Sequence, residues 1–143
     1  MRLYTLGFSH KSAEEFFDIL RESGARRVVD IRRSNTNQLA GFTKKDDLRY
    51  FLKVILDMPY THEVSLAPSA DLMHAYRHDE IEFDEFARKL RAEYEDGEVS
   101  SLDRSLFSDA VLLCSEADPS TCHRLVAAEY LAKAWDDVEV VHL

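Results

Sequence analysis

The sequence predicts an α/β fold: a single three-layer domain, residues 1–143, with a mostly parallel sheet of about five strands flanked by helices. Short apolar runs rich in β-branched residues alternate along the chain with longer segments in which apolar residues recur at helical spacing. That order is typical of a parallel sheet covered on both faces. The length of 143 residues and the 45% share of hydrophobic residues suit one domain with a substantial core.

The N-terminal segment predicts a strand–helix–strand unit. A strand is expected over residues 4–9. Ser12 and Glu15 have the spacing of a capping box in front of an amphipathic helix. Gly24 suits the end of that helix, because glycine readily adopts the left-handed conformation found there. The β-branched run at residues 27–31 then predicts a buried parallel strand.

A second helix–strand pair follows. Residues 34–41 are polar and aperiodic, so they predict a loop. Thr43 is expected to cap the next helix, in which apolar residues share one face and which Pro59 ends. Residues 60–64 predict the third strand.

The C-terminal half supplies the remaining elements. In chain order we expect helices over 70–77 and 83–95, a connection over 96–108, a strand over 110–114, a helix over 122–134 and a strand over 138–143. The apolar stripe of the helix over 83–95 is typical of a core-facing surface. Right-handed crossovers should link the parallel strands.

The charge balance argues against broad binding to nucleic acid. The net charge is −9, whereas phosphate backbones require clustered lysine and arginine. A local basic pocket remains open, because arginines flank the second strand on both sides. No apolar run approaches the roughly 20 residues that span a bilayer, so no membrane contact is expected. We find no secretion signal, and two neighbouring cysteines are typical of reduced thiols, so the expected location is cytoplasmic. The sequence indicates no oligomeric state.

Polar residues that follow the predicted strands should meet at one edge of the sheet. Parallel strands share their carboxyl edge, so residues just beyond each strand become neighbours although they are distant in the sequence. The residues expected there are Ser9 and His10, Asp30 with Arg32 and Arg33, His62 and Glu63, Cys114 and Glu116, and the helix start Cys122, His123 and Arg124. Imidazole, thiol, carboxylate and guanidinium groups at one rim are the groups that acid–base or nucleophilic chemistry needs.

Both cysteines lie between residues 111 and 124, the most informative part of the chain. Cys114 ends an apolar strand, so it is either a reactive thiol or a small buried core residue. Cys122 begins a helix beside His123 and Arg124. The helix dipole and two potential cations lower a thiol pKa there, and we therefore favour Cys122 as the reactive thiol. The histidine and the arginine could instead only cap the helix or pair with nearby acidic residues.

Asp30 is the other conspicuous polar residue, because it lies inside a β-branched run. Burying a carboxylate is expensive unless the group is paired or hydrogen-bonded. We expect Asp30 to anchor an arginine or the turn at Ser9 and His10. The alternative is a role as general base.

No metal or cofactor is expected. The spacing C-x-E-x5-C-H lacks the paired C-x2-C pattern of structural zinc sites. The adjacent Cys122 and His123 should reach one ion only if the start of the helix bends. An ion near Cys114, Cys122 and His123 remains an open alternative.

The same residues carry a resemblance to a family catalogued as domain of unknown function 488. The matching pieces are Thr5-Leu-Gly-Phe-Ser9, Val29-Asp-Ile-Arg32, Leu112-Leu-Cys-Ser-Glu116 and Pro119 followed by Cys122-His-Arg124. The run from Ser34 to Phe42 looks like the mark of one bacterial and archaeal subgroup. The resemblance covers essentially the whole chain and implies a compact α/β domain, but it implies no reaction.

The chain departs from that family pattern at one position. Leu125 stands where many relatives carry a second arginine, which weighs against a clamp of two adjacent arginines. A strand-end cysteine after Val-Asp-Ile-Arg is also faintly similar to rhodaneses, which carry sulfur on a cysteine. The longer loop of this chain does not match their short cradle, so that similarity is an analogy only.

These observations lead to two hypotheses about function. The first is an enzyme that acts on an anionic or phosphate-bearing substrate, with Cys122, His123, Glu116, Cys114, His10 and Asp30 as catalytic candidates. Its substrate-binding candidates are Arg124, Arg32, Ser9, Asn35, Gln38 and Phe42. The second is a non-catalytic module that holds a nucleotide or the end of a nucleic acid in the same pocket, with the loop from Asn35 to Phe42 contacting base or sugar.

Overall fold

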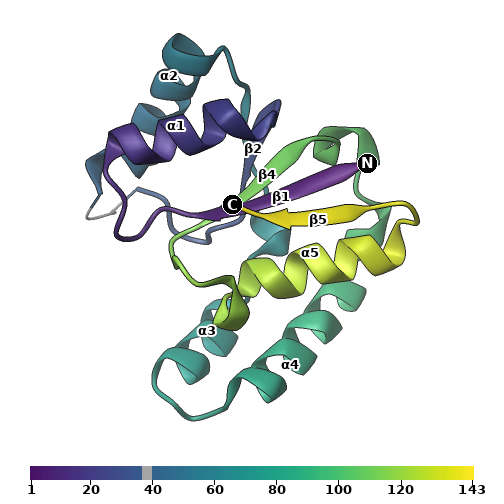
Figure 1. Ribbon diagram of the computed structural model, residues 1–143. Helices are drawn as coiled ribbons and strands as arrows, with labels where there is room; N and C mark the ends of the chain where they lie inside the picture. The colour runs from purple at the N-terminus through teal and green to yellow at the C-terminus, as the bar shows by residue number, and fades with distance from the viewer. Residues whose placement is uncertain (37–39) are drawn as a thin grey trace.

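The computed structural model describes residues 1–36 and 40–143, and it confirms the predicted three-layer α/β fold (Figure 1). The strands are β1 (Arg2–Gly7), β2 (Arg27–Asp30), β3 (Tyr60–His62), β4 (Ala110–Cys114) and β5 (Glu139–His142). The helices are α1 (Ala13–Ser23), α2 (Lys45–Leu56), α3 (Ala70–Arg77), α4 (Phe83–Asp96) and α5 (His123–Ala134). The strands form one sheet in the order β3-β2-β4-β1-β5, and every pairing is parallel. No helix in the described ranges is long and apolar enough to cross a membrane.

The helices form two layers, one on each face of the sheet. Helices α1 and α2 lie on one face, and α3, α4 and α5 lie on the other (Figure 1). Alternate residues of β4 serve the two cores: Val111 and Leu113 pack towards α1 and α2, whereas Leu112 and Cys114 belong to the core beneath α4 and α5. Because both faces of the central strand are covered, all five of its residues are buried.

The N-terminal helix has the predicted ends. The Ser12 hydroxyl accepts a hydrogen bond from the backbone of Glu15, and the Glu15 carboxylate accepts one from the backbone of Ser12. Gly24 follows the helix in the left-handed conformation, with φ of 82°. Both arms of the capping box are therefore present.

The predicted cap of α2 was wrong. Lys44 occupies the position before the helix, and its side chain makes no capping hydrogen bond. Thr43 belongs to the preceding helical turn, Gly41–Thr43, and its hydroxyl donates to the carbonyl of Ala40 at 2.8 Å. Residues 40–44 form hydrogen bonds with one another in that turn, and the Thr43 hydroxyl takes part in them. It is therefore not available to cap the helix.

The order of the strands creates a crevice beside β4. This strand lies between β1 and β2, but the helix that follows it covers the opposite face from the helices that follow its two neighbours. The connections therefore diverge at the carboxyl edge, which is where ligands bind in open α/β sheets. The register places the strand ends Gly7 and Cys114 side by side, with Asp30 opposite Leu113. The expected convergence of the strand ends is confirmed.

Gly7 lets β1 pass close to the loop that follows β4. A Cβ atom on this residue would overlap the carbonyl group of Glu116 and would lie 2.6 Å from Nη1 of Arg124. Both neighbours belong to a tightly packed region, because Arg124 is fully buried. Any side chain at position 7 would therefore push the loop away from the sheet.

We predict that Gly7→Ala lowers the free energy of unfolding by about 3 kcal/mol, the upper part of the range for overpacking a tight core. Urea unfolding followed by circular dichroism measures the change. Gly41→Ala is the matched control, because a Cβ at that position meets nothing within 4 Å. Equal stability of the two variants would contradict the proposed close approach.

Candidate functional site

Two adjoining cavities open at the carboxyl edge beside β4. The first has a volume of about 550 Å³ and is lined by residues that follow β2 and β4 and by residues of α3. Its titratable lining residues are three arginines and three histidines: Arg32, Arg33, Arg77, His74, His78 and His123. No carboxylate is found among its described lining residues. We call this cavity the cationic pocket.

The second cavity has a volume of about 330 Å³, and we call it the thiol pocket because Cys122 lines it. Glu116 also lies on its wall. The two cavities share Arg77, Ser115 and His123 among their lining residues. A ligand in the cationic pocket would therefore lie directly beside the thiol pocket.

A buried ion pair fixes Arg32, one of the residues that line the cationic pocket. The guanidinium donates to both carboxylate oxygens of Asp30, from Nε at 2.9 Å and from Nη2 at 2.8 Å. Asp30 is fully buried and also accepts hydrogen bonds from the hydroxyl of Tyr60 and the amide of Asn35. Burial, and then the nearby carboxylate, raises the pKa of Tyr60. Asp30 therefore has the anchoring role that the sequence favoured.

One donor of Arg32 is left over. Its Nη1 atom is buried and has no hydrogen-bond partner in the described part of the chain. The guanidinium carbon lies 5.2 Å from the centre of the Phe8 ring, which covers one face of the group. A buried donor without a partner costs about 1–3 kcal/mol. Because Nη1 is not exposed to the cationic pocket, Arg32 lines that pocket with other atoms.

The two cysteines form a buried pair behind the thiol pocket. Their Sγ atoms are 2.6 Å apart, and Nη1 of Arg124 lies 3.4 Å from Sγ of Cys114. Burial raises the pKa of the Cys114 thiol, but the hydrogen bond from Cys122 and the charge of Arg124 outweigh it and lower this pKa to about 7. Hydrogen bonding to Cys114, together with burial, raises the pKa of Cys122. Negative charge on the pair is therefore favoured on Cys114 rather than on Cys122.

The prediction of a lowered thiol pKa at Cys122 was wrong: the pKa of Cys114 is lowered and that of Cys122 is raised. The reason is the direction of Arg124, whose guanidinium turns back from the helix towards the end of β4. Cys122 nevertheless remains the sulfur that reaches a cavity, since it lines the thiol pocket and Cys114 does not. Cys114 is therefore the thiol with the lowered pKa, and Cys122 is the thiol that a ligand in the cavity could contact.

His123 is held as a neutral imidazole. Its Nε2 donates to the carbonyl of Ile31 at 3.0 Å, so the lone pair is on Nδ1, which lies 4.0 Å from Sγ of Cys122. Burial lowers the pKa of His123 to about 4, and the charges of Arg124 and Arg77 act in the same direction. The ring can therefore act as a base or as a ligand at neutral pH.

Arg124 is a structural arginine in this arrangement. It is fully buried and lines neither pocket. Its guanidinium donates to the Thr5 hydroxyl at 3.2 Å and to the carbonyls of Glu116 and Ala117. Arg124 therefore links the loop after β4 to β1 through hydrogen bonds, and it also contacts Cys114.

Of the other predicted site residues, Ser9 and Glu116 lie at the site, whereas His10, Asn35 and Phe42 line neither pocket. Ser9 lies at the edge, where its backbone donates to the Ser115 carbonyl at 2.8 Å, and Glu116 lines the thiol pocket. His10 is exposed and lines neither pocket, and Asn35 is buried in the hydrogen-bond network of Asp30. Phe42 packs against Phe16 in the layer of α1 and α2, with ring centres 5.4 Å apart. Gln38 lies outside the described residues.

The contribution of α3 was not predicted from the sequence. His74 and Arg77 of this helix and His78, which directly follows it, line the cationic pocket. They follow no strand, so reasoning from strand ends could not find them. Their spacing of three and four residues was the available signal, because it places them on one face of a helix. The rings of His74 and His78 are 4.0 Å apart.

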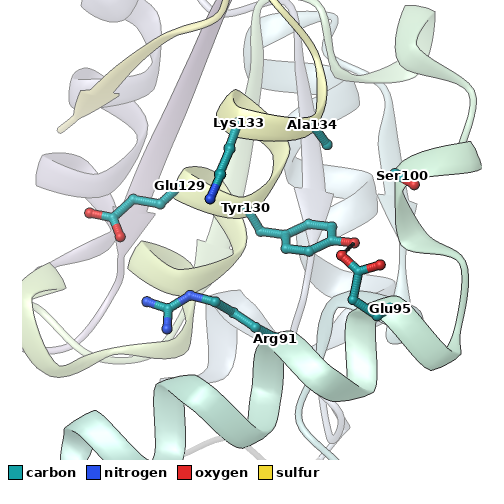
Figure 2. A pocket seen from close by; sticks show the side chains of 7 residues that line it. All are labelled: Arg91, Glu95, Ser100, Glu129, Tyr130, Lys133 and Ala134. Carbon is teal, nitrogen blue, oxygen red and sulfur yellow. Dashed lines mark hydrogen bonds between the residues drawn. The ribbon is translucent and has the colours of Figure 1, made fainter.

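A third cavity lies between α4 and α5 and is a weaker candidate (Figure 2). Its volume is about 760 Å³, and its wall mixes Arg91 and Lys133 with Glu95 and Glu129. The hydroxyl of Tyr130 donates to Glu95 at 2.7 Å, as Figure 2 shows. The charges balance and no thiol lines this cavity, so it lacks the features of the site beside β4.

One group of residues has the composition of a metal site. Cys114, Cys122 and His123 each offer one ligand atom, and these atoms all lie within 4.8 Å of one another. All three residues are buried. Two sulfurs and an imidazole nitrogen suit a soft or borderline cation rather than magnesium or calcium.

Comparison with known proteins gives a family and no more specific relative. The profile of the family DUF488, described as a domain of unknown function, matches residues 12–131. No curated protein and no solved structure gives a significant match. The matched range includes β2, β4, α3 and the start of α5, which together supply most of the site.

We predict that Asp30→Asn lowers the free energy of unfolding by about 3 kcal/mol, because it leaves the charge of Arg32 buried without its partner. Denaturant unfolding measures the change. Asp18→Asn is the matched control: it breaks an exposed ion pair with Arg21 and should cost less than about 1 kcal/mol. Similar losses in the two variants would show that Asp30 does not anchor Arg32.

Proposed function

The chain belongs to the DUF488 family, and we propose that it is an enzyme acting on an anionic, phosphate-bearing substrate. The anionic group would bind in the cationic pocket. The reaction would take place at the adjoining cluster formed by Cys114, Cys122 and His123. The observation that carries this proposal is the direct contact between a pocket lined by cations and a pocket lined by a thiol.

The charge of the cationic pocket supports an anionic ligand. The chain as a whole carries a net charge of −9, yet three arginines gather around this one cavity. Guanidinium groups bind phosphate through paired hydrogen bonds, and a concave site concentrates their field. The local charge therefore opposes the charge of the whole molecule, as an anion site requires.

The cluster beside the pocket offers groups for chemistry. Arg124 stabilises negative charge on the sulfur pair, and neutral His123 keeps the lone pair of Nδ1. Cys122, whose sulfur reaches the thiol pocket, would be the nucleophile, and the imidazole of His123 beside it would accept its proton. His123 lines both pockets, so it would stand between the bound anion and the sulfur of Cys122.

The alternative is a non-catalytic module that only holds a nucleotide or a nucleic-acid end. The cationic pocket would serve that function equally well. The residues expected to contact a base do not favour it, because Asn35 is engaged with Asp30 and Phe42 packs with Phe16. Turnover is therefore the property that separates the two functions.

We expect the protein to bind inorganic phosphate and phosphate monoesters, with the affinity carried by arginine. Arg33→Ala and Arg77→Ala should each weaken binding about tenfold or more, since a hydrogen bond to a charged group contributes about 1.5–3 kcal/mol. Isothermal titration calorimetry measures the affinities. Arg91→Ala, which removes an exposed arginine from the cavity between α4 and α5, is the matched control. Absence of phosphate binding, or equal losses in all three variants, would refute the proposed pocket.

The enzymatic function predicts a different pattern for the cluster. In a screen of phosphate monoesters and diesters, a substrate turned over by the native protein should no longer be turned over by Cys122→Ser. The same variant should bind phosphate as tightly as the native protein, because Cys122 does not line the cationic pocket. Phosphate binding without turnover of any tested ester would favour the binding module.

A further inference from the structure

We propose that Cys114, Cys122 and His123 bind one zinc ion, with its fourth coordination position open to the thiol pocket. This inference rests on the proposed function, because it names a resident ion for the same reaction centre. It replaces the sequence-based expectation that no metal binds. The ligand set would be two thiolate sulfurs and the Nδ1 atom of the imidazole.

The three ligand atoms already converge on one point. They lie within 4.8 Å of one another, and all three residues are buried. The sequence predicted that Cys122 and His123 reach one ion only if the start of the helix bends, and the backbone provides this bend. Cys122 is extended, with φ of −109° and ψ of 148°, and His123 is the first helical residue after it. Their side chains therefore leave the chain in directions that bring Sγ within 4.0 Å of Nδ1.

The hydrogen bond of His123 prepares the ring for a metal. A metal-binding histidine usually donates its second ring N–H to a carboxylate or a backbone carbonyl, which fixes the tautomer. Here Nε2 donates to the carbonyl of Ile31 at 3.0 Å, so the lone pair on Nδ1 faces the sulfur atoms. This contact is independent of the cysteines, and it selects the form of histidine that binds metal.

The two sulfur atoms are close enough for one ion to bind both. Their Sγ atoms lie 2.6 Å apart, and both cysteines are free. Zinc binding would release the thiol protons to solvent, because zinc binds the thiolate form of cysteine. Tetrahedral coordination with zinc–sulfur bonds of about 2.3 Å places the sulfurs about 3.8 Å apart, so binding would separate them by about 1 Å. Arg124, which donates to Cys114, would remain as a hydrogen-bond donor to a ligand sulfur.

Three protein ligands leave one position for water or substrate. Catalytic zinc sites have this pattern, whereas structural sites use four protein ligands. The thiol pocket lies on the Cys122 and His123 side of the cluster, and Glu116 lies on its wall as a carboxylate that could accept a proton. In the zinc-bound enzyme, the attacking group would be the zinc-bound water, and the thiolates would be its ligands.

Zinc titration of the reduced, metal-free protein against a chromophoric chelator tests this inference. We expect one equivalent to bind. Cys114→Ser, Cys122→Ser and His123→Ala should each weaken binding at least a hundredfold. His78→Ala should bind like the native protein, because His78 lies in the cationic pocket outside the cluster. Cobalt in place of zinc should give thiolate charge-transfer absorption and the visible bands of a tetrahedral site.

Circular dichroism of each variant separates loss of ligands from loss of fold. A folded native protein that binds no stoichiometric zinc would overturn the inference, and so would equal binding by the native protein and a folded Cys122→Ser variant. Phosphate titration of the same metal-free sample keeps the two proposals distinct. Phosphate binding without zinc binding would overturn the zinc site alone, whereas zinc binding without phosphate binding would overturn the proposed function.

Discussion

The buried guanidinium of Arg124 is the interaction on which the arrangement of the site depends. It contacts the Thr5 hydroxyl of β1, the Cys114 sulfur at the end of β4 and the carbonyls of the loop that leads to α5. These contacts fix where α5 begins, and the start of α5 carries Cys122 and His123. Gly7 is the condition for this packing, because a Cβ there would occupy the space of the loop carbonyl and of the guanidinium.

A second buried arginine, Arg32, has the opposite character. Nearly every donor of Arg124 is directed at an atom of the protein, whereas Asp30 orients Arg32 and leaves its Nη1 without a partner in the described chain. Arg124 therefore holds the cluster of Cys114, Cys122 and His123 in place, and Asp30 holds Arg32 beside the cationic pocket. Both arginines lie at the crevice that the strand order creates next to β4. The fold and the proposed chemistry meet at this crevice.

Local signals determined how much could be predicted. The helix over Ala70–Arg77 and the strand over Ala110–Cys114 have the predicted bounds, because periodicity and β-branched runs are properties of neighbouring residues. The convergence of Asp30 and Cys114 at one edge followed from parallel pairing, although β1 ends at Gly7, two residues before the predicted end of the first strand. The direction of the Arg124 side chain depends on packing against Thr5, which lies more than 100 residues away in the sequence. Because Arg124 contacts Cys114, the lowered pKa of Cys114 rather than Cys122 depends on the same packing. The contribution of α3 depends on how that helix packs over the rim, which no local pattern encodes.

The central claim is that an anion binds in the cationic pocket, next to the cluster of Cys114, Cys122 and His123. A crystal structure of the protein grown with a phosphate monoester tests it most directly. We predict that the phosphoryl group contacts Arg33 and Arg77, beside the ring of His123. A phosphoryl group found instead between α4 and α5, at Arg91 and Lys133, would contradict the account.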